Sequence, residues 1–261
     1  MSIASKLQDI LAAKADIKDA INAKGGEVTA ATLLADYAQA IDNLPSGDDS
    51  LLISILNRSA TTLDLSSLNL TELNDYAICY FPNLTAIILP ETLTTIGRCG
   101  IYENRKLTGI TIPNTVTSIG QAAFQYCGYN ATTFTVNMSN NVVSVGIDAF
   151  RACIKTTSLH FPDTLTTIGN SAFSYMHALT DVYIGTGIQT IGSNLFLGRG
   201  IAIPITLRIA ATTPPTLGTG LFIANTNYKI YVPDASVNDY KTATNWSTWA
   251  AYIYPLSEYT P

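Results

Sequence analysis

From about residue 60 to residue 232 the chain repeats a short alternation of apolar and polar positions. In each repeat two apolar residues flank a single position, as in Ile110-x-Ile112. Such alternation is typical of a strand with two side chains inside and one outside. The sequence therefore predicts eight strands, with cores at Leu63-x-Leu65, Ile87-x-Leu89, Ile110-x-Ile112, Phe134-x-Val136, Leu159-x-Phe161, Val182-x-Ile184, Leu207-x-Ile209 and Ile230-x-Val232.

An apolar residue followed by glycine recurs between these strands. Its glycines, Gly97, Gly120, Gly146, Gly169 and Gly192, step by 23, 26, 23 and 23 residues. A fixed period in this range indicates a solenoid, whose units bury their apolar faces by stacking. We expect the Ile-Gly pairs to turn the chain and the strands to form one parallel sheet. Phe124, Phe150 and Phe173 should enter the core, and three extra residues of the fourth repeat should lie near Ile154–Thr157.

Residues 3–24 show the spacing of an amphipathic helix. Apolar residues, with one lysine among them, step alternately by four and three positions, which is a heptad pattern. We call this set the seam, and it consists of Ile3, Leu7, Ile10, Lys14, Ile17 and Ile21. Isoleucine at both heptad positions favours a homotrimer. The alternative is a helix packed on its own chain, since three heptads are marginal as an isolated coiled coil.

Glycine, proline and charge place the boundaries of the chain. Gly25-Gly26 ends the first helix, and a second helical face follows up to Leu44. We predict an attachment or oligomerisation module over 1–45, a linker over 46–54, a solenoid of about eight rungs over 55–233 and a C-terminal cap over 234–261. Within the cap, Ser236–Thr242 should form a short helix, and Trp246, Trp249 and Tyr252 should cover the last rung.

Two resemblances attach to these segments. The unit LTGITIPNTVTSIGQAAF, which spans 107–124, resembles the BspA-like (Treponema pallidum-type) leucine-rich repeats, and similar units cover roughly 55–233. That resemblance implies a leucine-rich-repeat solenoid with a parallel sheet. The N-terminal segment that ends in LLADYAQAIDNLPSG resembles a short module of phage tail and baseplate-fibre proteins. It implies a virion anchor followed by a receptor-facing domain.

Composition and charge exclude several classes of protein. Hydrophobic residues make up 47% of the chain and charged residues only 13%, which argues against disorder. No apolar run reaches the length of a membrane helix, so membrane insertion is not expected. The solenoid has no basic stripe, which argues against a nucleic-acid partner because such binding needs clustered Lys and Arg. The first residues lack the apolar region of a cleavable signal peptide.

Candidate chemistry is sparse. Cys127 and Cys153 stand where other repeats have Phe or Met, so we interpret them as buried apolar residues. No CxxC pair, nucleotide-binding loop or hydrolase motif is present, and the acidic residues are scattered singly. His160 and His177 have ordinary interpretations as a strand residue and a turn residue. We therefore predict no catalytic residue, metal or cofactor.

The best candidate site is the outward face of the strands, which we call the outer column. One residue per rung gives Asp64, Ile88, Thr111, Thr135, His160, Tyr183, Arg208 and Tyr231, and a neighbouring column ends in Asp181, Thr206 and Lys229. We predict receptor binding by His160, Asp181, Tyr183, Arg208, Lys229 and Tyr231, because rigid aromatic side chains lose little entropy on binding. The alternatives are that Tyr and Thr are only good strand residues, or that loops on the opposite edge bind.

The leading hypothesis is a non-enzymatic phage tail-fibre or receptor-binding component located in the virion. Its partners would be a host cell-surface receptor, either glycan or protein, and other tail proteins joined through the N-terminal module. The alternative is a bacterial surface or secreted BspA-like adhesin. A glycan-degrading enzyme is a third hypothesis, which would need a pair of carboxylates that the sequence does not display.

Overall fold

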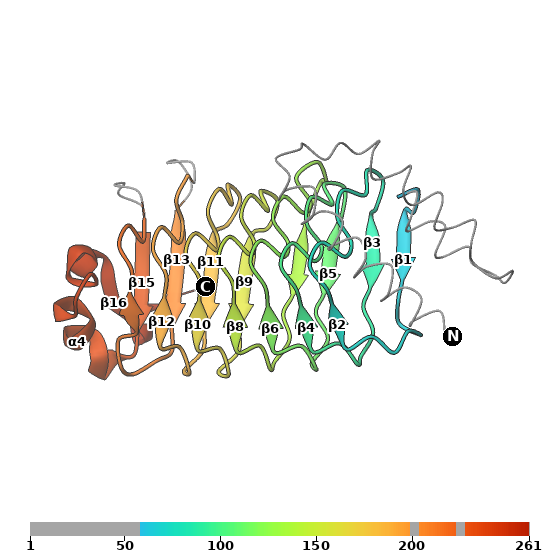
Figure 1. Cartoon of the computed structure of the whole chain (residues 1–261). Helices are drawn as coiled ribbons and strands as arrows, with labels where there is room; N and C mark the ends of the chain where they lie inside the picture. Colours follow the sequence, from blue (N-terminus) through green and yellow to red (C-terminus); the bar gives the residue numbers. More distant parts are fainter. Residues whose placement is uncertain (1–57, 199–203, 223–227, 261) are drawn as a thin grey trace, which may run out of the picture.

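The structure is a computed structural model that describes residues 58–198, 204–222 and 228–260. Successive rungs stack along one axis into an elongated solenoid, with β1 near one end and α4 at the other (Figure 1). The predicted class, a leucine-rich-repeat solenoid of parallel strands, is confirmed. The predicted N-terminal helical module over 1–45 and the linker over 46–54 lie outside the described residues.

The first strand of each rung contributes to an outer face. All pairs are parallel, in the groups β1-β3, β5-β7 and β9-β11-β13-β15-β16. These strands are β1 Thr62–Asp64, β3 Ala86–Ile88, β5 Gly109–Thr111, β7 Thr135–Asn137, β9 Ser158–Phe161, β11 Asp181–Ile184, β13 Ile205–Ile209, β15 Tyr228–Val232 and β16 Ile253–Pro255. The eight predicted strands are therefore present, and β16 adds one within the stretch expected to be a cap.

The Ile-Gly pairs do more than turn the chain. The residue before each glycine ends a second short strand, and these strands form an uninterrupted seven-stranded parallel sheet along the lower side in Figure 1. They are β2 Glu72–Leu73, β4 Thr95–Ile96, β6 Ser118–Ile119, β8 Ser144–Val145, β10 Thr167–Ile168, β12 Thr190–Ile191 and β14 Thr216–Leu217. The prediction of a single sheet was wrong, because two paired residues per rung are too few to show the alternation by which a strand is recognised in a sequence.

Close approach between rungs explains the glycines of these pairs. The N–H of Gly120 donates to the carbonyl of Ile96 at 2.7 Å. A Cβ atom at Gly120 would lie 2.6 Å from the carbonyl carbon of Gly97, and one at Gly146 would lie 2.6 Å from the nitrogen of Gln121. Any larger residue would therefore push two rungs apart.

The third side of each rung consists of turns that are hydrogen-bonded from rung to rung. Phe124 N–H donates to the carbonyl of Ala149 at 2.8 Å, and Phe150 N–H donates to Ala172 at 2.9 Å. Left-handed residues recur four positions apart in this segment, such as Ala122 with φ 54° and Tyr126 with φ 62°. The regular backbone pairing holds these conformations in place, although left-handed geometry costs about 1 kcal/mol for a residue other than glycine.

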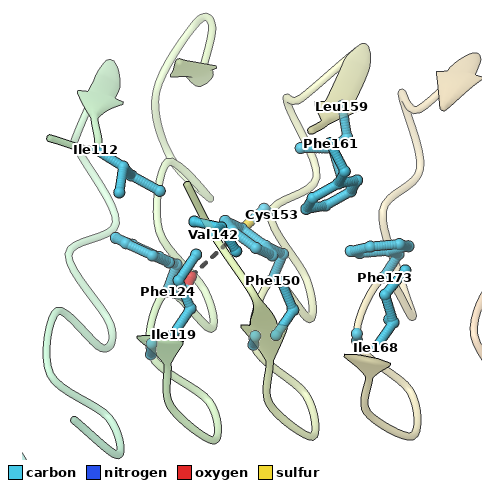
Figure 2. Packing of buried hydrophobic residues seen from close by; sticks show 14 of the residues in the cluster. Ile112, Ile119, Phe124, Val142, Phe150, Cys153, Leu159, Phe161, Ile168 and Phe173 are labelled. Atoms are coloured by element: carbon cyan, nitrogen blue, oxygen red, sulfur yellow. Dashed lines mark hydrogen bonds between the residues drawn. The ribbon is translucent and has the colours of Figure 1, made fainter. Parts of the chain in front are cut away.

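A column of aromatic rings runs through the core, as expected from the repeated Ala-Phe pairs. Phe124 and Phe150 stack with their centroids 5.1 Å apart, and Phe173 follows 6.3 Å from Phe150 (Figure 2). All four cysteines are buried, and none of them forms a disulfide. Cys153 donates its thiol hydrogen to the carbonyl of Phe124 at 3.0 Å, and burial raises the pKa of Cys127 to about 12. The interpretation of Cys127 and Cys153 as core residues is confirmed.

The C-terminal residues cover the end of the solenoid. They form the 3-10 segment η1 Asp234–Ser236, the helix α4 Val237–Thr242, the segment η2 Ser247–Tyr252, strand β16 and η3 Leu256–Glu258. The predicted helix thus begins one residue later than expected. Trp246 is fully buried and donates its indole N–H to the carbonyl of Pro215 at 2.8 Å. Tyr240, also fully buried, donates to the carbonyl of Ala211 at 2.9 Å.

Candidate functional site

The predicted outer column is correct over its C-terminal part and shifted at one rung. In the parallel register His160 pairs with Tyr183, Tyr183 with Arg208, and Arg208 with Tyr231. These residues therefore lie side by side on four adjacent strands. Strands β9, β11, β13, β15 and β16 form this face as one sheet (Figure 1).

At the fourth rung the predicted register was wrong by two residues. Thr111 pairs with Asn137, whereas Thr135 pairs with Gly109. The inward residues of this rung near the column are Val136 and Met138, both only partly buried. Alternation could not detect the error, because a shift by two positions leaves every side chain on the same face. Asn137 therefore takes the place of Thr135 in the outer column.

The insertion behind this shift also lies elsewhere than expected. Twelve positions separate Phe124 from Val136, against nine from Phe150 to Leu159. The three extra residues therefore belong to the segment 128–133 and not to Ile154–Thr157. Within that segment Asn130 N–H bonds back to the carbonyl of Arg105 at 2.7 Å. The loop is thus tied to the preceding rung.

A network of ion pairs organises the column around Asp181. Its two carboxylate oxygens accept hydrogen bonds from Arg208, with Nε at 3.1 Å from Oδ1 and Nη2 at 2.7 Å from Oδ2. Oδ2 also lies 3.0 Å from Nε2 of His160. The side chain of His160 is 63% exposed, that of Asp181 25% and that of Arg208 17%. His160 is therefore open to a partner, while Arg208 mainly holds Asp181 in position.

Aromatic rings cover the C-terminal end of the column. The guanidinium carbon of Arg208 lies 4.6 Å from the ring centroid of Tyr259 and 5.4 Å from that of Tyr183. Tyr231 packs 5.3 Å from Tyr259 and 5.8 Å from Tyr254, measured between centroids, and is only 6% exposed. Because β16 and the residues after it return over β15, Tyr231 is not available for the direct contact that the sequence predicted.

The neighbouring column holds Lys229 as expected. Asp181 pairs with Thr206 and Thr206 with Lys229 in the register. Lys229 is exposed beside a hollow of about 380 Å³ whose lining also includes Thr206, Tyr228 and Tyr254. The predicted site residues thus form one surface, with Asp181 and Arg208 at its centre, His160, Tyr183 and Lys229 around them and Tyr231 beneath.

A second hollow, of about 500 Å³, lies at the other end of this surface. This hollow lies between strands β7 and β9. Its lining includes Asn137, Lys155, Ser158 and His160. Sequence reasoning missed this hollow, because it depends on the break between two strands that the periodic pattern predicts to be paired.

Tyrosines on the turns form a separate surface that sequence reasoning also missed. We call it the tyrosine ladder, and it consists of Tyr80, Tyr102, Tyr126 and Tyr129. Successive ring centroids lie 5.3, 6.2 and 6.0 Å apart in edge-to-face geometry. Arg105 lies over the last two rings at 5.3 and 5.2 Å. The steps of 22 and 24 residues between the first three tyrosines were a signal in the sequence.

The described residues offer little for metal or acid–base chemistry. Among them, no group of three or more His, Cys, Asp or Glu side chains could hold a metal ion. His177 is exposed on a turn. A search of the described part of the chain for a helix long and apolar enough to cross a membrane found none.

The stacked rungs, most of which pair a strand of the outer face with a two-residue strand of the seven-stranded sheet, define a leucine-rich-repeat solenoid. Six copies of the BspA type leucine rich repeat region match the chain, over residues 54–131 and 129–210. The chain belongs to this family. No curated protein matches the sequence.

Solved structures with a similar arrangement come from several bacteria. A leucine-rich repeat protein from Bacteroides ovatus gives a TM-score of 0.41 at 20% identity, over 67% of this chain and 56% of that one. A leucine rich cell surface protein from Faecalibacterium prausnitzii gives 0.40 at 20% identity, over 78% and 61%. The pneumococcal vaccine antigen PcpA gives 0.33 at 14% identity, over 76% and 66%. The chain thus spans less than two thirds of each of these proteins.

Proposed function

We propose that this chain is a non-enzymatic binding protein of the bacterial surface or secreted adhesin kind, and that it contacts its partner through the C-terminal part of the outer column. Membership of the BspA type family supports the general role, since solenoids of this kind offer long regular surfaces for binding. The observation that carries the proposal is the fixed network of His160, Asp181 and Arg208 beside Tyr183.

Rigidity makes this surface suitable for recognition. Arg208 contacts both oxygens of Asp181 and lies over two tyrosine rings. The side chains are therefore ordered before a partner arrives, and binding costs less conformational entropy. His160, which is exposed, adds a hydrogen-bonding group, and Tyr183, which is half-buried, adds an aromatic ring on the adjacent strand.

The same network argues against catalysis at this place. Both oxygens of Asp181 already accept hydrogen bonds from Arg208. The guanidinium group of Arg208 does not lose its proton at physiological pH. A general acid or base needs a proton that can move to or from a substrate. Asp181 is thus better suited to holding a shape than to transferring a proton.

Replacing His160 and Tyr183 together by alanine tests the proposed surface. His160 is the most exposed member of the network, and Tyr183 is the half-buried ring beside it. We therefore expect the variant to lose about tenfold or more of its affinity while its unfolding transition stays nearly unchanged. The measurement is flow cytometry of the labelled full chain on a panel of bacterial and epithelial cells.

A matched variant on the tyrosine ladder, Tyr80→Ala with Tyr129→Ala, serves as the control. It also removes exposed aromatic surface, at 46% and 37% exposure, but on the turns. Loss of binding in this variant and retention in the first would place the contact on the ladder and contradict the outer column. A wild-type chain that binds no cell in the panel would contradict the proposed function itself.

The second candidate function is a phage tail-fibre component, which the N-terminal sequence alone favours. In this proposal residues 1–45 join the solenoid to other tail proteins, residues 46–54 act as a linker and the solenoid contacts the host receptor. The heptad seam and the resemblance to tail and baseplate-fibre modules support it.

Substitution within the seam tests this second candidate. If the seam forms a trimer, Ile10→Asp with Ile17→Asp should convert the full chain to a monomer without melting the solenoid, because each aspartate would be buried without a partner. Light scattering measures the mass. Ser5→Asp with Ala12→Asp carries the same charges on the opposite side of the heptad and should leave the trimer intact. A monomeric wild-type chain would contradict the oligomer.

A further inference from the structure

The outer face is interrupted between the fourth and fifth rungs. β7 pairs with β5 on one side and β9 pairs with β11 on the other, but no ladder joins β7 to β9. Thr156, which is buried, donates its hydroxyl hydrogen to the carbonyl of Phe134 at 3.0 Å. A side-chain hydrogen bond therefore joins the two rungs where the strand ladder is missing.

The hollow at this interruption has the size and lining of a small-ligand site. Its volume of about 500 Å³ exceeds what a single ion needs and lies in the usual range for ligand pockets. Most of its lining carries hydroxyl or amide groups. These residues are Thr133, Thr135, Asn137, Asn140, Thr156, Thr157 and Ser158.

Lys155 gives the hollow its charge. It is half-buried and lines the hollow, and its ammonium group makes no hydrogen bond or ion pair with the residues that the structure describes. This contrasts with Arg208, which contacts Asp181, and Arg105, which contacts Glu103. A partly desolvated cation without a partner favours an anion. The other basic group in the lining, His160, is held by Asp181.

We propose that this hollow binds an acidic sugar, with the carboxylate at Lys155 and the ring hydroxyls at the hydroxyl and amide groups of β7 and of residues 157–158. The half-buried side chains of Val136 and Met138 provide apolar area for the face of the ring. The inference rests on the proposed binding function and names a ligand class for it. An extended peptide is less well suited, because the free edges of β7 and β9 span only three and four residues.

Titration of the full chain with a tetramer of galacturonic acid and with sialyl-lactose tests this site by calorimetry. Lactose and inorganic phosphate are the comparison ligands. We expect at least one acidic sugar to bind, lactose and phosphate to bind more weakly by about tenfold or more, and the affinity to fall as salt rises.

The variants separate the role of Lys155 from a general effect of charge. Lys155→Ala should reduce the affinity for the acidic sugar about tenfold or more, and Lys155→Arg should retain most of it. Lys106→Ala removes an exposed lysine that bonds to Asn83 and should have no effect. Equal affinity of the wild-type chain and Lys155→Ala, equal binding of lactose, or equal binding of phosphate would each overturn the proposal.

Comparison with the cell-binding measurement distinguishes two kinds of failure. If neither acidic sugar binds while cell binding still depends on His160 and Tyr183, the proposed ligand is wrong and the binding function stands. If a short acidic peptide binds in place of the sugars and Lys155→Ala abolishes this, the hollow recognises protein and the sugar proposal is overturned. If an acidic sugar binds but the chain binds no cells, the proposed sugar site stands and the proposed adhesin function is contradicted.

Discussion

Replacing Phe173 by alanine is expected to lower the free energy of unfolding by about 3–5 kcal/mol. Phe173 is fully buried and contacts three other rings, Phe150, Phe161 and Phe196, at centroid distances of 6.3, 5.4 and 5.8 Å. Its removal would leave a cavity in the middle of the aromatic column, because stacked rungs cannot close the gap without losing backbone hydrogen bonds. Urea denaturation followed by circular dichroism measures the change.

Phe173→Leu is the matched control for this variant. Leucine keeps much of the volume and removes the ring contacts, so a cost of about 1–2 kcal/mol is expected. Because each rung contacts only its neighbours, the alanine variant should also broaden the transition, as the two halves of the array begin to unfold separately. An alanine variant as stable as the wild type would show that the aromatic column does not hold the rungs together.

Replacing Gly146 by alanine should destabilise the protein by about 1–3 kcal/mol, although the added group is a single methyl. The new Cβ would lie 2.6 Å from both the nitrogen of Gln121 and the carbonyl carbon of Gly120. Both are backbone atoms, so relief requires the two rungs to separate and weakens the hydrogen bond from Gly146 N–H to Ile119, which is 2.8 Å long. The shift in thermal midpoint measures the effect.

Gly109→Ala provides the comparison on the other sheet. There the nearest backbone atom would be the carbonyl oxygen of Thr135 at 3.1 Å, and the position is only half-buried at the start of β5. We expect little change or a small gain, since alanine restricts the unfolded chain. Equal losses at both positions would mean that close approach between rungs is not the reason for the glycine in each Ile-Gly pair.

Much of the fold could be predicted from period and alternation alone. Residues that recur at one phase of the repeat predict the inward positions of seven of the eight strands. They also predict the burial of Phe124, Phe150, Phe173, Cys127 and Cys153. The register of β7 could not be predicted, since Phe134 and Val136 are both apolar and lie two positions apart. Only the pairing of Thr111 with Asn137 in the structure decides between them.

The candidate site was predictable in its members and not in its contacts. Spacing along the repeats placed His160, Tyr183 and Arg208 on adjacent strands, and the structure agrees. The burial of Tyr231 could not be predicted from the sequence. Tyr259, which packs against it, belongs to the C-terminal segment, and no periodic pattern links the two residues. The hollow beside Lys155 depends on a missing ladder between strands, which a repeating pattern cannot reveal.

The insertion over 128–133 has an evolutionary consequence. The seven-stranded sheet passes it unbroken, with Ser118 still paired to Ser144. The number of residues in a rung can therefore vary on the turn side while the seven-stranded sheet keeps its regular strand pairing. New recognition surfaces can arise by lengthening a single turn, and the rungs on either side need not change their own sequences to accommodate it.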